Sequence, residues 1–318
     1  MAAFDVVALT RDLIGGMELD AFDRDVREKQ VAKFESAISQ ERLAALFTLS
    51  KLETLLKLEA VPAVYVDLFD GGNLRRLVDV QSKTGKSNVA VIAENLRRGA
   101  TLRVRDIDKF DSGLSRLARA IRNQFAAQSQ INVYLTPASK AGFAPHFDTT
   151  DVFVLQCLGE KEWRIYPNYT NKVELPLMET PWDPDRFRPC GPAQSFTLRP
   201  GDVLYVPRGE MHEAFCAERE SMHLTISIAP LTFSDLLAKA LKAAAESDVR
   251  FRRRVRWSVS VENGDAQISA EGTQLASDLA RQIDVRPLLS SERDTLQGLV
   301  STELPDSLES AIKSAVER

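Results

Sequence analysis

Residues 145–166 read PHFDTTDVFVLQCLGEKEWRIY, and this stretch decides the fold. Its β-branched and aromatic residues form two short runs on either side of a turn signal at Gly159 and Glu160, which is typical of neighbouring β-strands. Many short strands separated by turn signals predict a sandwich or barrel between about residues 131 and 230. The other runs of this kind are 131–136 (INVYLT), 195–209 (SFTLRPGDVLYVPRG) and 223–230 (HLTISIAP).

The flanking regions predict mainly helices. From Ala2 to about Leu58, apolar residues recur at spacings of three and four with few glycines or prolines. The first strand is expected at 61–69, where β-branched and aromatic residues concentrate. A further helical segment has its apolar residues on one face, which should pack against the sheet; they are Leu114, Leu117, Ile121 and Phe125. The predicted class is therefore α+β.

Composition places the protein in an ordinary globular class. The chain has 318 residues, 44% of them hydrophobic and 27% charged, which excludes disordered and collagen-like classes and suggests two structural units. A formal charge of −4 gives no global attraction to nucleic acid or to an anionic membrane. We therefore expect no direct nucleic-acid binding and no membrane association.

The cysteines and the amino terminus predict a cytoplasmic location. Cys157, Cys190 and Cys216 form an odd set without CxxC spacing, which argues against a disulfide framework and against a zinc ribbon. The first residues carry an acid at Asp5 and lack a basic start followed by an unbroken apolar run, so they do not predict a secretory signal. No window reaches the length of about 18 apolar residues that a membrane span requires.

The histidines supply the first functional clue, because all three lie within the strand-rich segment 131–230. His146 and Asp148 are two residues apart, so on a strand they project to the same face and can reach one ion. His212 lies 66 residues after His146, directly after a strand and turn that would bring it back beside the first pair. Two imidazoles and one carboxylate form the facial triad of non-haem Fe(II) oxygenases, which leaves positions open for a co-substrate and oxygen.

A simpler interpretation exists for each of these residues. An HxD tripeptide alone is a weak signal, and a single histidine in a strand is more often a structural hydrogen-bonding group than a ligand. The downstream pattern, in which GD, a strand and PRG precede His212, and the scarcity of other histidines favour the metal site. His223 is left out of the ligand set and assigned to the core or to the surroundings of the site.

Taken together, three stretches resemble a known family: residues 132–137 (NVYLTP), 145–166, and 200–212 (PGDVLYVPRGEMH). They are similar to the JmjC-type, cupin-like 2-oxoglutarate oxygenases, specifically the ribosomal-oxygenase branch. The resemblance implies a double-stranded β-helix (jelly-roll) core, Fe(II) as the metal, and 2-oxoglutarate and O₂ as co-substrates. It also implies hydroxylation of a protein or peptide side chain.

The same resemblance implies which residues bind 2-oxoglutarate. Lys161, thirteen residues after Asp148, matches the lysine that pairs with the distal carboxylate in that family, and Asn132, Tyr134 and Ser227 match positions lining the co-substrate pocket. A dianion in a closed pocket needs a cation, and removing one partner of such a buried pair costs roughly 2–5 kcal/mol. Without the resemblance, the hairpin setting of Lys161 favours an exposed turn charge instead.

The predicted organisation is a catalytic domain over 1–230, a helical segment over 231–257 and a small domain over 258–318. Thr232 and Asp235 read as a capping box before an apolar helical stripe, which predicts a homodimer contact, although the stripe could instead pack within the chain. The basic run after the stripe, RFRRRVRW, could meet an acidic peptide or an RNA-rich particle, or could be a solvated face.

The last sixty residues depart from the family pattern. Asn263 and Gly264 predict a hairpin over 258–269, followed by helical segments. This region is short for the winged-helix module that usually ends a ribosomal oxygenase, and it could be a reduced form of that module. The shortness weakens the assignment of a ribosomal-protein substrate and raises the possibility of a ribosomally made precursor peptide.

Two functions from different classes are therefore compared. The leading hypothesis is an Fe(II)- and 2-oxoglutarate-dependent hydroxylase of a protein or peptide side chain. The alternative is a catalytically silent cupin-like module used for binding. The intact set of His146, Asp148 and His212, together with Lys161, argues against the silent module.

Overall fold

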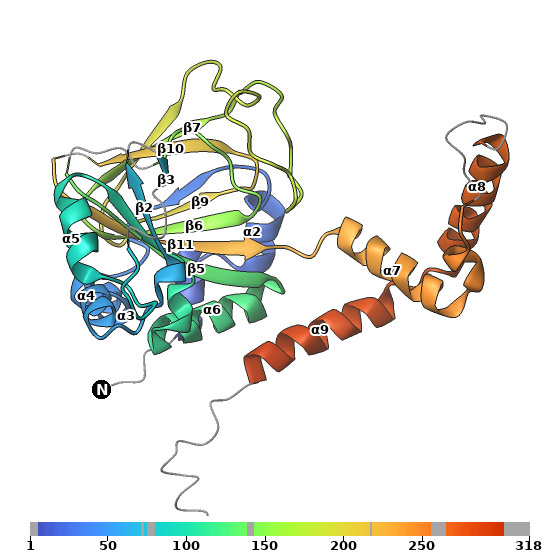
Figure 1. Cartoon of the computed structure of the whole chain (residues 1–318), viewed down its shortest axis with the longest axis horizontal. Helices are drawn as coiled ribbons and strands as arrows, with labels where there is room; N and C mark the ends of the chain where they lie inside the picture. Colours follow the sequence, from blue (N-terminus) through green and yellow to red (C-terminus); the bar gives the residue numbers. More distant parts are fainter. Residues whose placement is uncertain are drawn as a thin grey trace, which may run out of the picture. The chain divides into compact units, whose positions relative to one another are not determined.

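The computed structural model describes residues 6–70, 73–74, 80–138, 143–216, 218–255 and 265–301. After Pro230 the chain divides into two compact units, 1–230 and 231–318 (Figure 1). Both sheets belong to the first unit, and the described part of the second unit is helical. No helix among the described residues is both long and apolar enough to cross a membrane.

Short helices open the first unit, in agreement with the prediction. The side-chain hydroxyls of Ser39 and Thr48 accept hydrogen bonds from the backbone N–H groups of Arg42 and Lys51, and these bonds cap the third and fourth helices. The four helices are α1 (Val6–Leu13), α2 (Leu19–Asp25), α3 (Gln40–Leu46) and α4 (Leu49–Lys57).

Two strands differ from the predicted layout. β1 (Ala32–Phe34) lies inside the region predicted to be helical and pairs with β9 (Val203–Val206). The prediction that 61–69 holds the first strand was wrong, since β2 (Val66–Asp70) comes second and a 3₁₀ turn behind Pro62 precedes it. A three-residue strand is too short to show a period of two, and its partner lies far away in the sequence.

Every strand of the described chain pairs antiparallel, in two sheets (Figure 1). The larger sheet has eight strands in the order β1-β9-β6-β11-β5-β4-β2-β3, and the smaller sheet has three in the order β10-β7-β8. The strands not yet bounded are β3 (Asn73–Leu74), β4 (Thr101–Val104), β5 (Gln128–Thr136), β6 (Asp151–Leu158), β7 (Lys161–Tyr166), β8 (Gln194–Leu198), β10 (Met211–Cys216) and β11 (Ser221–Ala229). The predicted α+β class is confirmed.

Apolar cores lie on both faces of the larger sheet. Along β6, Phe153 and Leu155 join the core that the helices cover, whereas Val152 and Val154 join the core between the two sheets. This alternation is the period of two that a strand buried on both faces requires. The core between the sheets is completed by Trp163, Ile165, Leu198, Leu204, Val206 and Ala214.

Helices α3 to α6 lie against one side of the larger sheet (Figure 1). α5 spans Val89–Arg97, and α6 spans Ser112–Phe125 directly after a short 3₁₀ helix at Ile107–Lys109. The apolar face predicted for α6 is confirmed, since Leu114, Leu117, Ile121 and Phe125 are all buried. Burying such a stripe is what holds an amphipathic helix on a sheet.

Polar side chains gather on the opposite face of the same sheet. On β11, Leu224 and Ile226 join the helix-covered core, so the alternate residues His223 and Thr225 face the smaller sheet. Tyr134 of β5 lies opposite His223 in the strand register and shares this face. The functional side chains described below come from this face and from the smaller sheet.

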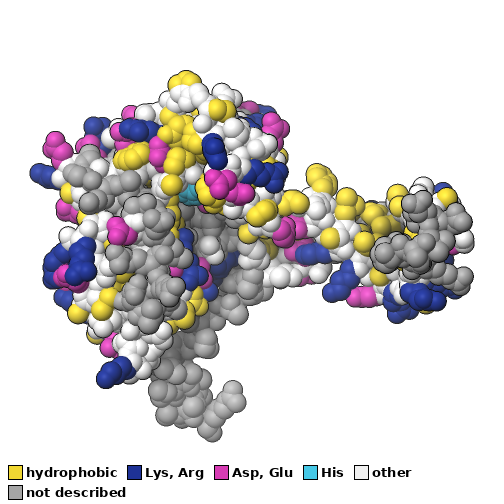
Figure 2. Space-filling model, turned by 45° about the horizontal axis from the view of Figure 1, so that its top comes forward, with side chains coloured by type: hydrophobic (Ala, Val, Ile, Leu, Met, Phe, Trp, Pro, Cys, Tyr) yellow, Lys and Arg dark blue, Asp and Glu magenta, His cyan; other side chains and the backbone are white. Residues whose placement is uncertain are grey.

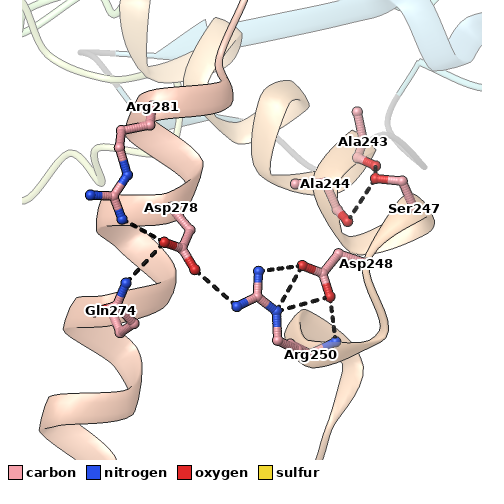
Figure 3. A network of polar contacts seen from close by, with 8 residues as sticks. All are labelled: Ala243, Ala244, Ser247, Asp248, Arg250, Gln274, Asp278 and Arg281. Atoms are coloured by element: carbon pink, nitrogen blue, oxygen red, sulfur yellow. Dashed lines mark hydrogen bonds and ion pairs between the residues drawn. The ribbon is translucent and has the colours of Figure 1, made fainter.

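The second unit begins with α7 (Phe233–Ser247), whose predicted capping box between Thr232 and Asp235 is confirmed. A 3₁₀ helix (Val249–Arg252), α8 (Asp265–Gln282) and α9 (Arg286–Ser301) follow. In Figure 3, Arg250 bridges Asp248 and Asp278, and Asp278 also accepts from Gln274 and Arg281. These groups are partly exposed, so solvent screens the ion pairs and each contributes little to stability.

The sequence predicted a hairpin over 258–269, and the prediction of its second strand was wrong. Residues 256–264, which include Asn263 and Gly264, lie outside the described residues, but Asp265–Ser269 form the first turns of α8. Ile268, Leu275 and Leu279 are its less exposed apolar residues, at the spacing of one helical face. Over 265–301 the carboxy-terminal region is helical apart from a short link.

The turn between β6 and β7 should tolerate no side chain at Gly159. Its φ is +63°, and an added Cβ would lie 1.9 Å from the Glu220 carbonyl oxygen. We expect Gly159→Ala to lower the free energy of unfolding by about 2–4 kcal/mol, because left-handed backbone strain and steric overlap add. Gly16 has a φ of +77° and nothing within 4 Å, so Gly16→Ala is the matched control, with a loss of about 1 kcal/mol. Equal losses in chemical denaturation would contradict the close approach.

Candidate active site

A backbone bridge brings two of the predicted ligands together. His146 lies in the irregular segment before β6 and forms an isolated antiparallel bridge with His212 of β10. The N–H of His146 donates to the His212 carbonyl at 3.0 Å, and the N–H of His212 donates to the His146 carbonyl at 2.7 Å. The two histidine side chains are thereby held next to each other.

The predicted triad of His146, Asp148 and His212 converges. The two imidazole centroids are 4.6 Å apart, and His212 Nε2 lies 3.7 Å from Asp148 Oδ2. One ligand atom from each residue lies within 4.8 Å of the other two. His212 is buried, whereas the Asp148 side chain is 39% exposed, so the group opens toward solvent on the Asp148 side.

Both imidazoles are oriented by backbone carbonyls. Nδ1 of His146 lies 2.9 Å from the Ala144 carbonyl oxygen, and Nδ1 of His212 lies 2.9 Å from the Glu210 carbonyl oxygen. Such contacts place the proton on Nδ1 and leave the Nε2 lone pair for a metal. Burial, together with the neighbouring His146, lowers the pKa of His212 to about 4, so this imidazole is neutral at physiological pH, as a ligand must be.

The triad borders a cavity of about 180 Å³ between the two sheets. This volume is below the usual range for drug-sized ligands and suits a small co-substrate. The cavity combines apolar walls with a few polar groups. It is lined by Thr101, Arg103, Tyr134, Phe143, His146, Asp148, Val152, Val154, Lys161, Trp163, Val206, His212, Ala214, His223 and Thr225.

Lys161, the predicted anchor of the co-substrate, lines this cavity. Lys161 is 2% exposed, so it is not a charged residue exposed in a turn. Its Nζ donates to Thr136 Oγ1 at 3.1 Å. No carboxylate of the described residues pairs with it. Burial lowers the pKa of Lys161 to about 8, against an ordinary value of 10.5. A buried ammonium without a counter-ion is costly, so this end of the cavity is suited to an anion.

Comparison with known proteins identifies the family. A model of the JmjC domain family matches residues 107–236. Ribosomal oxygenase 1 of Bos taurus is 32% identical over 249 residues, which cover 76% of this chain and 37% of that protein. The chain is a JmjC-domain, ribosomal-oxygenase-like protein. A Dictyostelium discoideum relative, named bifunctional lysine-specific demethylase and histidyl-hydroxylase NO66, is 34% identical over 51% of this chain and 32% of its own length.

The JmjC chain thus spans well under half the length of these curated relatives. Among solved structures, ycfD of Escherichia coli is similar with a TM-score of 0.50 and 16% identity, over 85% of this chain and 69% of that one. At this identity the likeness concerns the fold, and the expected cupin-like β-helix core is confirmed. JmjC oxygenases use Fe(II) and 2-oxoglutarate, which confirms the cofactor and co-substrate expected from the family.

Aromatic rings build the inner wall of the JmjC site. The imidazole of His223 stacks on the ring of Tyr134, with centroids 4.9 Å apart and an interplanar angle of 3°. Trp163 meets His223 edge-on at 5.4 Å and also lies 5.8 Å from the His212 ring. Burial raises the pKa of Tyr134, so its hydroxyl stays protonated.

Arg103 supplies a second cation at the cavity wall. Its guanidinium lies over the rings of Phe69 and Phe143, at 4.9 and 5.8 Å from their centroids. Its Nη2 pairs with Asp67 Oδ2 at 2.7 Å. Because Arg103 already has a carboxylate partner, it differs from Lys161, which has none among the described residues.

Two predicted co-substrate residues do not line the cavity. The side-chain oxygen of Asn132 accepts from the backbone N–H of Asp106 at 3.0 Å, and the Ser227 hydroxyl donates to the Gln130 carbonyl at 3.2 Å. Both share the sheet face of Tyr134 but lie farther along it. Their assignment to the co-substrate stays a prediction.

Sequence reasoning missed several residues of the site. Arg103, Trp163 and His223 line the cavity, and only His223 was considered, as a residue of the core or surroundings. A signal existed for Trp163, since it lies two residues after Lys161 on β7 and so shares its face. No comparable signal existed for Arg103, because β4 meets the site only through its pairing with β5.

The buried charge of Lys161 should destabilise the protein in the absence of ligand. With a folded pKa of about 8 and an ordinary value of 10.5, the cost below pH 8 is on the order of 3 kcal/mol. We expect Lys161→Met to raise the free energy of unfolding at pH 7 by part of this amount. The free energy of unfolding of the wild type, relative to that variant, should rise between pH 8 and 10.5, because Lys161 loses its proton at a lower pH in the folded protein than in the unfolded chain.

Chemical denaturation at pH 7 and pH 10 measures this difference. Lys172→Met is the control, because that lysine is partly exposed and paired with Glu210. A Lys161→Met variant less stable than the wild type at pH 7 would contradict the unpaired buried charge.

Proposed function

We propose that this JmjC protein is an Fe(II)- and 2-oxoglutarate-dependent oxygenase that hydroxylates a side chain of a protein. One observation carries the proposal: a triad of two histidines and one aspartate borders a small cavity that is also lined by a buried lysine without a counter-ion among the described residues. The triad fits a ferrous ion, and the lysine fits the far end of a dicarboxylic keto acid. A silent binding module would need neither.

The spacing of these groups fits 2-oxoglutarate. His212 lies opposite Ile165 in the register of β10 and β7, and Lys161 lies four residues before Ile165 on the same strand. Four residues of strand cover roughly 13 Å, which a lysine side chain and a five-carbon diacid can span from both ends. His146, Asp148 and His212 would hold the iron, while Lys161 would bind the distal carboxylate and Tyr134 would border the pocket.

The chemistry then divides between cofactor and protein. Bound Fe(II) and 2-oxoglutarate supply oxidation by O₂, which yields succinate, CO₂ and one oxygen atom inserted into a substrate C–H bond. The residues of the chain bind and orient the co-substrate, and the apolar walls exclude water. Val152, Val154 and Val206 supply these walls on the larger sheet.

A protein substrate is supported by the open side of the triad and by the relatives. Asp148 is partly exposed, and the ring of Trp182, in the 167–193 connection, lies 6.5 Å from that of His146. Exposed Leu177 and Met178 belong to the same connection. A histidine side chain (cyan) reaches the surface beside apolar side chains in Figure 2.

The names of the relatives point to ribosomal proteins as the substrate class, ahead of a biosynthetic precursor peptide. One relative's name also includes lysine demethylation, which the same site chemistry can perform by oxygen insertion at an N-methyl carbon. Mass spectrometry of ribosomal proteins incubated with the enzyme separates the cases. A gain of one oxygen atom indicates hydroxylation, and loss of a methyl group indicates demethylation. A cytoplasmic location without nucleic-acid binding stays a prediction.

Removing a triad ligand should abolish turnover while the fold survives. We expect His146→Ala and Asp148→Ala to reduce succinate formation from 2-oxoglutarate more than about 100-fold, because even the partners of metal ligands typically contribute 10–100-fold. Thermal unfolding should change little, since both residues lie at the open side of the site. Succinate is measured by NMR.

Asp185→Ala, in the 167–193 connection, is the matched control for the loss of a carboxylate outside the cavity lining. Its side chain is 91% exposed and, among the described residues, forms an ion pair only with Arg188, so activity should be retained. Wild-type rates of succinate formation in both ligand variants would refute the proposed function.

We also propose that the protein forms a homodimer through α7. Phe233, Leu237 and Leu241 recur every four residues along this helix and are 85%, 51% and 47% exposed. An exposed apolar stripe of this kind marks an interaction surface. Of the predicted stripe, Leu236 and Ala240 are buried within the chain, as the alternative expects, whereas Leu237 and Leu241 stay exposed and remain available for a partner.

Charged substitutions in the stripe test the dimer. We expect Leu237→Glu combined with Leu241→Glu to convert a dimer into a monomer in light scattering, because burying two carboxylates in an apolar contact is unfavourable. Lys242→Glu, at a neighbouring exposed position of α7, should leave the dimer intact. A monomeric wild type at micromolar concentration would contradict the proposal.

A further inference from the structure

Two rings that line the cavity each carry a buried nitrogen without a hydrogen-bond partner among the described residues. His223 is 3% exposed and Trp163 is 6% exposed, and both line the cavity. Within the described part of the chain, His223 Nδ1 and Trp163 Nε1 are buried atoms without a partner. An indole N–H can only donate, so Trp163 needs an acceptor that these residues do not supply.

Neither ring is free to turn toward another partner. His223 stacks face to face on Tyr134, and the Trp163 ring stands perpendicular to it, at an interplanar angle of 84°. Well-packed rings hold their rotamers, so the unpartnered nitrogens belong to the resting geometry of the site. Buried polar atoms without partners are rare in native proteins and call for an explanation, such as a ligand.

The strand register places both rings next to Lys161. Trp163 is two residues after Lys161 on β7, so the two side chains share a face. On β5, Tyr134 lies opposite His223, and the next residue on the same face is Thr136, which accepts the Lys161 hydrogen bond. The ammonium and the two rings therefore surround one end of the cavity.

The His223 ring is neutral at this place. Burial, together with the nearby charge of Lys161, lowers the pKa of His223 well below its ordinary value. A neutral imidazole carries one N–H, and a carboxylate next to a cation favours the tautomer that donates toward it.

We propose that His223 Nδ1–H and Trp163 Nε1–H both donate hydrogen bonds to the carboxylate that Lys161 neutralises. The inference rests on the proposed function, since the carboxylate is the distal one of 2-oxoglutarate. A carboxylate has about four lone-pair sites, so it accepts three donors at once. His223, left out of the site on sequence grounds, thus becomes a co-substrate-binding residue.

The arrangement determines selectivity among keto acids. In 2-oxopentanoate a methyl group replaces the distal carboxylate, which would leave one ammonium and two ring N–H groups buried without an acceptor. Sites built to hydrogen-bond a polar group reject the analogue that lacks it far more strongly than apolar pockets reject a size change. The wild type should therefore bind 2-oxoglutarate at least about 100-fold more tightly than 2-oxopentanoate.

Calorimetric titration of the Mn(II)-loaded full chain with both keto acids tests the inference without turnover. We expect His223→Phe and Trp163→Phe each to weaken 2-oxoglutarate binding about tenfold or more, as a hydrogen bond to a charged group predicts. Binding of 2-oxopentanoate should stay within about twofold, because the rings remain but its methyl group accepts no hydrogen bond.

Two further variants separate hydrogen bonding from packing. His223→Gln keeps a side-chain donor and should recover most of the 2-oxoglutarate affinity that the phenylalanine variant loses. Tyr166→Phe removes a hydrogen-bond donor from the opposite face of β7, where the Tyr166 hydroxyl donates to Glu213 outside the cavity lining, and should change neither affinity. Equal weakening of both keto acids, or no weakening of either, would overturn the inference.

If the phenylalanine variants do not fold, the wild type still decides the question. The chain has only three histidines, so the ¹⁵N signals of the Zn(II)-loaded protein can be assigned. His223 Nδ1 should carry a proton and shift on addition of 2-oxoglutarate but not of 2-oxopentanoate. An unprotonated or unshifted Nδ1 would overturn the inference. Failure of the wild type to bind 2-oxoglutarate would instead refute the proposed function.

Discussion

The pair of backbone hydrogen bonds between His146 and His212 is the contact on which the site depends. It joins an irregular segment to β10 and brings together two imidazoles that are 66 residues apart in the chain. Backbone carbonyls also orient both rings, so main-chain geometry rather than neighbouring side chains positions the ligands. A metal centre held in this way requires little of the surrounding sequence beyond the ligands themselves.

The two faces of the larger sheet serve different purposes. The helix-covered face is apolar and supplies most of the core, whereas the opposite face carries His223 and encloses a cavity together with Lys161 and Trp163 of the smaller sheet, beside the triad. A buried ammonium and unpartnered ring nitrogens lower the stability of the protein without ligand. The apolar core opposite them offsets that cost, and such compromises are expected at functional sites.

Local signals in the sequence determined much of this protein. Short β-type runs separated by turn signals predicted the strand-rich core, and one apolar face predicted α6. The HxD pair and the later histidine were found because i and i+2 residues of an extended chain share a face. The capping box of α7 could also be predicted from the local sequence, since its two hydrogen-bonding partners lie three residues apart.

Only the tertiary structure decided which polar residues meet in the cavity. Arg103, Trp163 and His223 reach it from three strands, and strand pairing between distant segments carries no local signature. Asn132 shares the sheet face of Tyr134, but its side-chain oxygen accepts from the Asp106 N–H and it does not line the cavity. The sequence by itself specified the ligand chemistry and the fold class, whereas burial, which converts Lys161 from a turn charge into an unpaired cation, arises only from packing of the two sheets.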